Sequence, residues 1–161
     1  MNKKILVVDD EADLCALIKR FLEATGRYSV ITTTLPEEAE GICKKEKPDL
    51  VLLDIVMPQM KGTELIKILR TDPQTSRIKI VVTSGGGEMT YSREEKKWSW
   101  QPNRPLVYER GEIFKEKSHS LAAERYGVDD YLAKPFPPAF LLQVVDDLFN
   151  NDKNDKNDIS E

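Results

Sequence analysis

Five short apolar runs alternate with stretches of helical periodicity along the chain. The runs are rich in β-branched residues and cover residues 4–8, 28–33, 50–53, 78–83 and 131–133. Between and after them, apolar residues recur every three or four positions in 14–22, 36–45, 62–70, 121–126 and 140–149, a spacing that predicts amphipathic helices. Strands alternating with helices predict right-handed crossovers and a parallel sheet covered by helices on both faces.

Several breaker and capping residues set the expected boundaries of these elements. Gly26 and Gly127 follow the helical patterns that they end. Thr34 is the expected cap of the second helix, with Glu37 closing a capping box. Pro58 cannot continue a strand, so the third strand has ended and a loop has begun by that residue.

One segment does not fit the alternation. More than thirty residues separate the strand that ends at Thr83 from the resumed pattern near Ser118, which predicts an insertion at about 86–118. Two structures are open for it: a short helix capped by Ser92, or a hairpin that pairs residues 98–100 with 106–108. Trp98 and Trp100 either pack the insertion onto the domain or form a partner-binding patch.

The length of 161 residues suits one domain, which we expect to span residues 1–150. The repeated Asn, Asp and Lys residues of 151–161 include almost nothing apolar, so we expect a disordered polar tail. A tail of this kind would leave no folded output domain after residue 150, which favours a stand-alone protein whose output is protein contact.

Composition limits the expected ligands and cellular location of the protein. The net charge is -4 and charged residues are 32% of the chain, which does not indicate a basic face for nucleic acid. The sequence predicts no membrane span and no signal peptide. Cys15 and Cys43 have no CxxC spacing, so reduced thiols and a cytoplasmic location are expected.

The ends of the predicted strands carry the candidate chemistry. Asp9 and Asp10 follow the first strand, Asp54 the third, Thr83 ends the fourth and Lys134 follows the fifth. The carboxyl ends of parallel strands share one edge of the sheet, where ligands of open α/β sheets bind. Three carboxylates there would repel one another without a cation, and Mg²⁺ suits an incomplete cage of oxygen ligands, with Mn²⁺ as a substitute.

These strand-end residues suit phosphoryl transfer. The Asp54 carboxylate can attack phosphorus and form an aspartyl phosphate, while the Thr83 hydroxyl and the Lys134 ammonium can bind phosphoryl oxygens. Structural roles compete with this interpretation, since Asp54 could begin a loop and Asp9 and Asp10 could cap the first helix. The glycines of 85–87 lack the rest of a P-loop, and the lone His119 belongs to no Ser or Cys arrangement typical of nucleophilic catalysis, so we expect a solvated helix residue.

Four ordered motifs resemble the receiver domain of bacterial response regulators, including its chemotaxis-type single-domain members. They are residues 7–11, residues 53–58 with Gly62, residues 82–84 and residues 131–136, and the resemblance runs from about residue 3 to residue 150. It implies a flavodoxin-like (βα)5 three-layer sandwich with a five-stranded parallel sheet of order 2-1-3-4-5.

The resemblance also implies roles for individual residues. Asp54 would be the phosphoacceptor, with Mg²⁺ bound directly by Asp10, largely through water by Asp9, and by the Val56 carbonyl. Thr83 and Lys134 would bind the phosphoryl oxygens. The Lys134–Pro135 peptide bond would be cis. Tyr131 would be the switch aromatic, although a plain core role is equally compatible with the sequence.

The implied function is two-component signalling. A histidine kinase or histidine phosphotransfer protein would donate the phosphoryl group, and the phosphorylated chain would switch a face that binds an unknown downstream protein; a dimer is compatible with this. Such a protein catalyses only its own phosphorylation and dephosphorylation. One alternative is a scaffold that is never phosphorylated. Another is an aspartate-nucleophile phosphohydrolase, which is disfavoured because Val56 stands where that class generally has a second Asp.

Overall fold

The computed structural model describes residues 1–85, 87–92, 97–102 and 127–157. Its main sheet is parallel and five-stranded, with the order β2-β1-β3-β4-β7. The strands are β1 (Lys3–Val8), β2 (Tyr28–Thr33), β3 (Leu50–Asp54), β4 (Lys79–Gly85) and β7 (Asp130–Lys134). Numbering only the strands of this sheet gives 2-1-3-4-5, so the predicted flavodoxin-like fold is confirmed.

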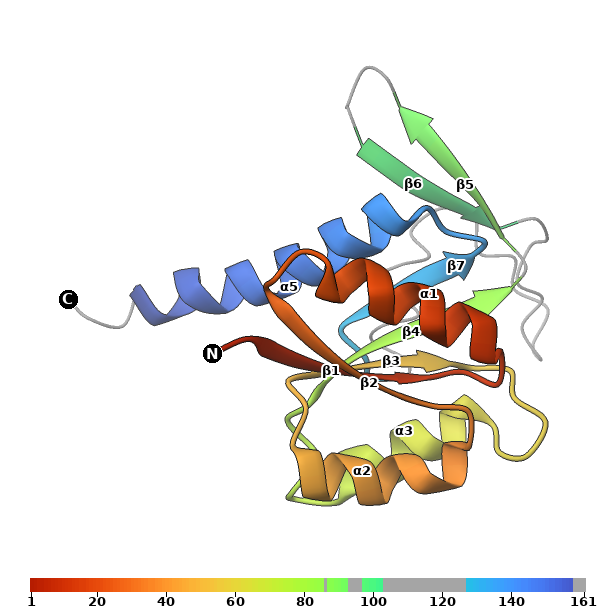
Figure 1. Ribbon diagram of the computed structural model, residues 1–161, viewed down its shortest axis with the longest axis vertical. Coiled ribbons are helices and arrows are strands. Elements are labelled where there is room, and N and C mark those ends of the chain that lie inside the picture. Colours follow the sequence, from red (N-terminus) through yellow and green to blue (C-terminus); the bar gives the residue numbers. More distant parts are fainter. Residues whose placement is uncertain (86, 93–96, 103–126, 158–161) are drawn as a thin grey trace, which may run out of the picture.

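Helices cover both faces of the sheet (Figure 1). One face carries α1 (Ala12–Glu23) and α5 (Pro138–Asn157). The other carries α2 (Ala39–Glu46), which a 3-10 turn at Pro36–Glu38 precedes, and α3 (Gly62–Thr71). The predicted helix at 121–126 lies outside the described residues.

Alternation along the strands divides the core into two layers. In β1, Ile5 and Val7 pack with the α1 and α5 layer, while Leu6 and Val8 pack with the α2 and α3 layer. All four side chains are at most 1% exposed. A strand covered on both faces must be apolar throughout, which explains the continuous apolar runs in the sequence.

The predicted cap of the second helix and the predicted disorder of the tail are both wrong. The turn before α2 is held by Thr33 rather than Thr34, because the Leu35 N–H donates to the Thr33 hydroxyl at 3.1 Å. That hydroxyl lies 3.3 Å from Glu38, so Glu37 does not close the expected box. The helix α5 continues to Asn157, through most of the predicted disordered tail, because extending an existing helix adds a hydrogen bond per residue without a new nucleus.

A separate two-stranded antiparallel sheet lies between β4 and β7 in sequence, formed by β5 (Gly87–Ser92) and β6 (Lys97–Pro102). Trp98 pairs with Tyr91 and Trp100 with Met89. The expected pairing of 98–100 with 106–108 is therefore wrong, and Ser92 ends a strand instead of capping a helix. Residues 106–108 themselves lie outside the described residues.

Across the described ranges, no helix is long and apolar enough to cross a membrane.

Candidate functional site

Three aspartates meet at the edge where β1 and β3 end. Asp9 follows β1 and is 3% exposed, Asp54 is the last residue of β3 and is 5% exposed, and Asp10 is exposed. One carboxylate oxygen from each lies within 4.8 Å of the others. The structure thus brings together the three acidic residues that the sequence placed at one edge.

Lys134 reaches this cluster from the end of β7. Its Nζ lies 2.6 Å from Asp9 Oδ2, 3.2 Å from Asp54 Oδ2 and 3.4 Å from Glu11 Oε1. Burial alone would lower the pKa of Lys134, but the hydrogen bond and charge of Asp9 and the charge of Asp54 outweigh it, so the pKa is raised. The lysine therefore stays charged. The peptide bond between Lys134 and Pro135 is cis, as predicted.

The two oxygens of Asp54 have different partners. Oδ1 accepts a hydrogen bond of 3.0 Å from the Val56 N–H, and Oδ2 contacts Lys134. Burial raises the pKa of Asp54, the Val56 N–H and the Lys134 charge lower it, and the Asp9 charge raises it again; the net direction is upward. The carboxylate is thus held in one orientation by its own loop and by a distant strand.

Gly62 fixes the loop after Asp54. Its N–H donates to the Ile55 carbonyl at 2.9 Å. A Cβ on Gly62 would lie 2.5 Å from the Asp54 carbonyl oxygen and 2.7 Å from the Ile55 Cα, closer than real Cβ atoms approach. Only glycine lets the start of α3 approach the end of β3 in this way.

Thr83 and Tyr131 lie on neighbouring strands beside Asp54. Thr83 is the direct register partner of Asp54 and is 2% exposed, and its carbonyl accepts from the Ile55 N–H at 3.0 Å. Tyr131 pairs with Val82 and packs, half-buried, against the layer of α2 and α3. The placement of Tyr131 is compatible with both a core role and a switch role.

Two contacts at the site were not predicted. Glu11 contacts Lys134, and the only signal for it was its position directly after Asp9 and Asp10. Asp9 also accepts from the Glu11 N–H at 2.9 Å, which forms a turn before α1 and not the helix cap considered as the alternative, since the N-cap of α1 is Glu11 and has no side-chain cap hydrogen bond. The Cys15 thiol lies 3.4 Å from the Asp9 carbonyl oxygen, a contact that sequence spacing does not reveal.

The charge balance of the cluster fits a divalent cation. Three carboxylates face one ammonium, so the cluster keeps an excess of negative charge in a largely buried place. Carboxylates are the hard oxygen ligands that Mg²⁺ prefers, and three of them leave coordination positions for water and a phosphoryl oxygen. Val56, whose carbonyl was the expected further ligand, is 70% exposed in the adjoining loop.

Comparison with known proteins gives a consistent family. Residues 5–97 match the response regulator receiver domain. The chain is 33% identical over 138 residues to the alkaline phosphatase synthesis transcriptional regulatory protein PhoP of Bacillus subtilis, covering 86% of this chain and 45% of that protein. It is 29% identical to the chemotaxis protein CheY of Thermotoga maritima, covering 90% of this chain and 96% of that protein.

A solved structure supports the fold. The CheY-like response regulator receiver domain protein of Methanospirillum hungatei aligns with a TM-score of 0.68 at 24% identity, covering 96% of this chain and 99% of that one. The chain spans about half the length of transcriptional regulators such as PhoP and the PhoB of Rhizobium meliloti.

Proposed function

This chain belongs to the response regulator receiver domain family of two-component systems, and from that premise we propose that Asp54 accepts a phosphoryl group from a histidine kinase or a histidine phosphotransfer protein. The observation that carries the proposal is the placement of Asp54 beside Asp9, Asp10 and Lys134 at one edge of the sheet. Family membership alone does not single out an acceptor residue, and this constellation is what supports Asp54.

The transfer step needs few groups from the chain. A carboxylate oxygen of Asp54 forms a bond to phosphorus as the P–N bond of the donor phosphohistidine breaks, and the imidazole leaves with the electron pair and takes a proton from water. Mg²⁺, held by Asp9, Asp10, Asp54 and the Val56 carbonyl, would supply positive charge to the phosphoryl oxygens. The chain's main task is to orient the carboxylate, which the Val56 N–H and Lys134 do.

The switch would begin with Lys134 and Thr83. Lys134 Nζ contacts both Asp9 and Asp54, so binding a phosphoryl oxygen would require it to exchange at least one of these partners. Thr83 is the register partner of Asp54 on the next strand, and its hydroxyl would donate a hydrogen bond to another phosphoryl oxygen. Because β4 and β7 carry these two residues, phosphorylation would shift the equilibrium of the face that includes Tyr131.

We propose residues 1–150 as the receiver domain, with 86–118 as an insertion. The hairpin of β5 and β6 begins four residues after Thr83, so it follows closely in sequence the end of β4, which would move on phosphorylation. A downstream protein partner would then bind the face around β4 and β7. The chain would act as a signalling phosphoacceptor that catalyses only its own phosphorylation and dephosphorylation.

The test is phosphoryl uptake measured by mass. The chain is incubated with acetyl phosphate, with Mg²⁺ or with EDTA, and intact mass is followed for wild type, Asp54→Ala and Asp13→Ala. Asp13 is an exposed acidic residue in the first turn of α1, outside the cluster, and serves as the matched control. We expect one added phosphoryl group in wild type and Asp13→Ala with Mg²⁺, and none in Asp54→Ala. Equal uptake by Asp54→Ala, or none by wild type, would overturn the proposal.

A further inference from the structure

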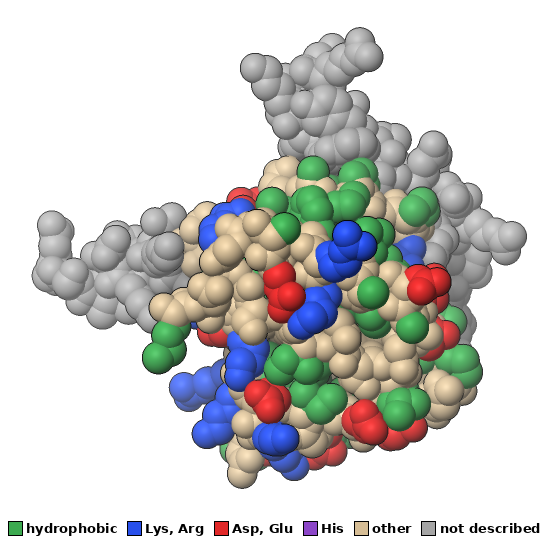
Figure 2. Space-filling model, in the orientation of Figure 1, with side chains coloured by type: hydrophobic (Ala, Val, Ile, Leu, Met, Phe, Trp, Pro, Cys, Tyr) green, Lys and Arg blue, Asp and Glu red, His purple; other side chains and the backbone are tan. Residues whose placement is uncertain are grey.

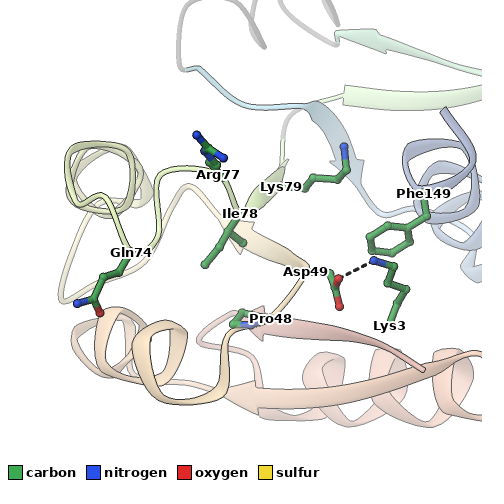
Figure 3. Close-up of a pocket in the computed structure, with 8 residues that line it drawn as sticks. All are labelled: Lys3, Pro48, Asp49, Gln74, Arg77, Ile78, Lys79 and Phe149. Carbon is green, nitrogen blue, oxygen red and sulfur yellow. Dashed lines mark hydrogen bonds and ion pairs between the residues drawn. The ribbon is translucent and has the colours of Figure 1, made fainter. Parts of the chain in front are cut away.

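A shallow cavity of about 280 Å³ opens at the edge of the sheet where the strands begin, opposite the acidic site. Its lining comes from the starts of β1 and β4, the residues before β3, the connection after α3, and α5 (Figure 3). Lysine and arginine side chains gather toward this left-hand edge in Figure 2. The chain as a whole has a net charge of -4, so a cavity lined mainly by basic residues differs from the rest of the protein and calls for an explanation.

The Lys3 ammonium lies on one side of the cavity, paired with Asp49. Lys3 Nζ lies 2.7 Å from Asp49 Oδ1 and 5.3 Å from the centre of the Phe149 ring. The other oxygen of Asp49 accepts from the Lys4 N–H at 2.8 Å. Both oxygens of Asp49 are therefore engaged, and its charge is balanced by Lys3, whose ammonium keeps further N–H donors for a ligand. Lys79 and Arg77 leave the lining as a whole net basic.

The other side of the cavity presents hydrogen-bond donors. Arg77 is exposed, and none of the described residues forms an ion pair with its guanidinium. Figure 3 shows Arg77 and Gln74 on the side away from Lys3 and Phe149, with Pro48 and Ile78 between the two groups. Pro48 and Ile78 are largely buried and form an apolar floor.

We propose that this cavity binds an acidic peptide segment of a partner protein, with an apolar residue between two carboxylates. The arrangement is cation, apolar floor, cation: Lys3 at one end, Pro48 and Ile78 in the middle, and Arg77 at the other. Arginine forms paired hydrogen bonds with carboxylates, and acidic motifs are commonly bound by such basic groups. The small volume and open shape suit side chains of an extended peptide better than an enclosed small molecule.

This proposal does not depend on phosphorylation. The cavity shares no residue with the acidic cluster, and the two sites lie at opposite ends of the parallel strands. Its test therefore uses the full chain without phosphodonor, so that failure here leaves the Asp54 proposal untouched and the reverse also holds.

The experiment titrates the ¹⁵N-labelled chain with the capped peptide Gly-Asp-Leu-Asp-Gly and follows backbone amide shifts. We expect saturable shifts of Lys3, Asp49 and residues 77–79. The matched peptide Gly-Asn-Leu-Asn-Gly has the same shape without charge and should bind at least about tenfold more weakly. Arg77→Gln should weaken binding of the acidic peptide about fivefold.

The controls separate a built site from general charge attraction. Lys67→Gln removes the same charge from an exposed position on α3 outside the cavity and should change binding less than about twofold. Inorganic phosphate is titrated alone at matched ionic strength. The proposal is overturned if no saturable shifts appear, if the Asn peptide binds equally well, or if phosphate alone reproduces the same shifts at the same affinity.

Discussion

Gly62 and Asp54 are 8 positions apart in sequence, yet a Cβ on Gly62 would lie 2.5 Å from the Asp54 carbonyl oxygen. The clashing atoms are backbone atoms of Asp54, the residue proposed to carry the phosphoryl group, and of its neighbour Ile55, so no side-chain rotation can relieve the contact. The requirement for glycine here is close packing at the site, and any larger residue must move the Asp54 loop.

The first prediction concerns Gly62→Ala. We expect the free energy of unfolding to fall by about 1–3 kcal/mol, as in other overpacked sites, and phosphoryl uptake to slow because the loop is displaced. Gly41→Ala is the matched control, since its Cβ would meet no described heavy atom within 4 Å beyond its own helix. That change should stabilise α2 by about 0.5–1 kcal/mol. Urea unfolding measures both, and equal effects of the two variants would contradict the packing argument.

The sequence was sufficient for the layers of the fold. Fully apolar runs such as Leu50–Leu53 indicate strands buried on both faces, and alternation with helical periodicity leaves a parallel sheet as the natural solution. The strand order was not derivable from periodicity and came from the family resemblance. The candidate site followed because parallel strands must bring Asp9, Asp54 and Lys134 to one edge.

What the sequence could not give depends on contacts between distant segments or on small differences in local energy. Thr33 and Thr34 are both good capping residues, and only the path of the chain after β2 selects the first. From the sequence, the partner strand of Trp98 could be any nearby β-prone segment, because a burial pattern fixes register strongly only where it is known which face is buried. The 2.6 Å contact of Lys134 with Asp9 joins residues 125 positions apart.

The second prediction tests the register of the hairpin. Thr90 and Ser99 are direct cross-strand partners, so cysteines at these positions should form a disulfide under mild oxidation. The pair Ser99→Cys with Val107→Cys samples the rejected antiparallel pairing of 98–100 with 106–108 and should cross-link far less. Mass spectrometry of digested, unreduced protein identifies the bridge. Preferential linkage of residues 99 and 107 would refute the observed register.

The third prediction concerns the buried thiols. Burial raises the pKa of both Cys15 and Cys43 to about 11, from the ordinary value of 9.0. Because thiolate is the reactive form, labelling by a disulfide reagent at pH 8 should occur only through unfolding of the chain. Rates that rise with urea in parallel with unfolding would agree with this, whereas complete labelling of the folded protein within the mixing time would not.

The raised thiol pKa values also fix the direction of a pH effect. The folded state favours the neutral thiols, so their contribution to stability is complete below the unfolded pKa of 9.0 and is lost as pH rises through about 11. The comparison is between wild type and the double variant Cys15→Ala, Cys43→Ala, so that only the contribution of the thiols differs. The wild type should lose more stability than the variant between pH 9 and 11, measured by urea unfolding.

The fourth prediction concerns Lys134→Met, which keeps the side-chain length and removes the charge. In EDTA the three carboxylates then lose the ammonium that contacts Asp9 at 2.6 Å and Asp54 at 3.2 Å. We expect the free energy of unfolding to fall by about 2–3 kcal/mol, somewhat below the range for fully buried pairs because 16% of the lysine side chain is exposed.

Mg²⁺ should reverse much of the loss in Lys134→Met, because a cation held by Asp9, Asp10 and Asp54 replaces the missing positive charge. The rise in melting temperature on adding Mg²⁺ should therefore be larger in this variant than in wild type, where lysine competes for the same carboxylates. Lys67→Met, exposed on α3, should respond to Mg²⁺ as wild type does. If Mg²⁺ stabilised wild type and Lys134→Met equally, lysine and metal would not share the carboxylates, and the electrostatic account of the site would fail.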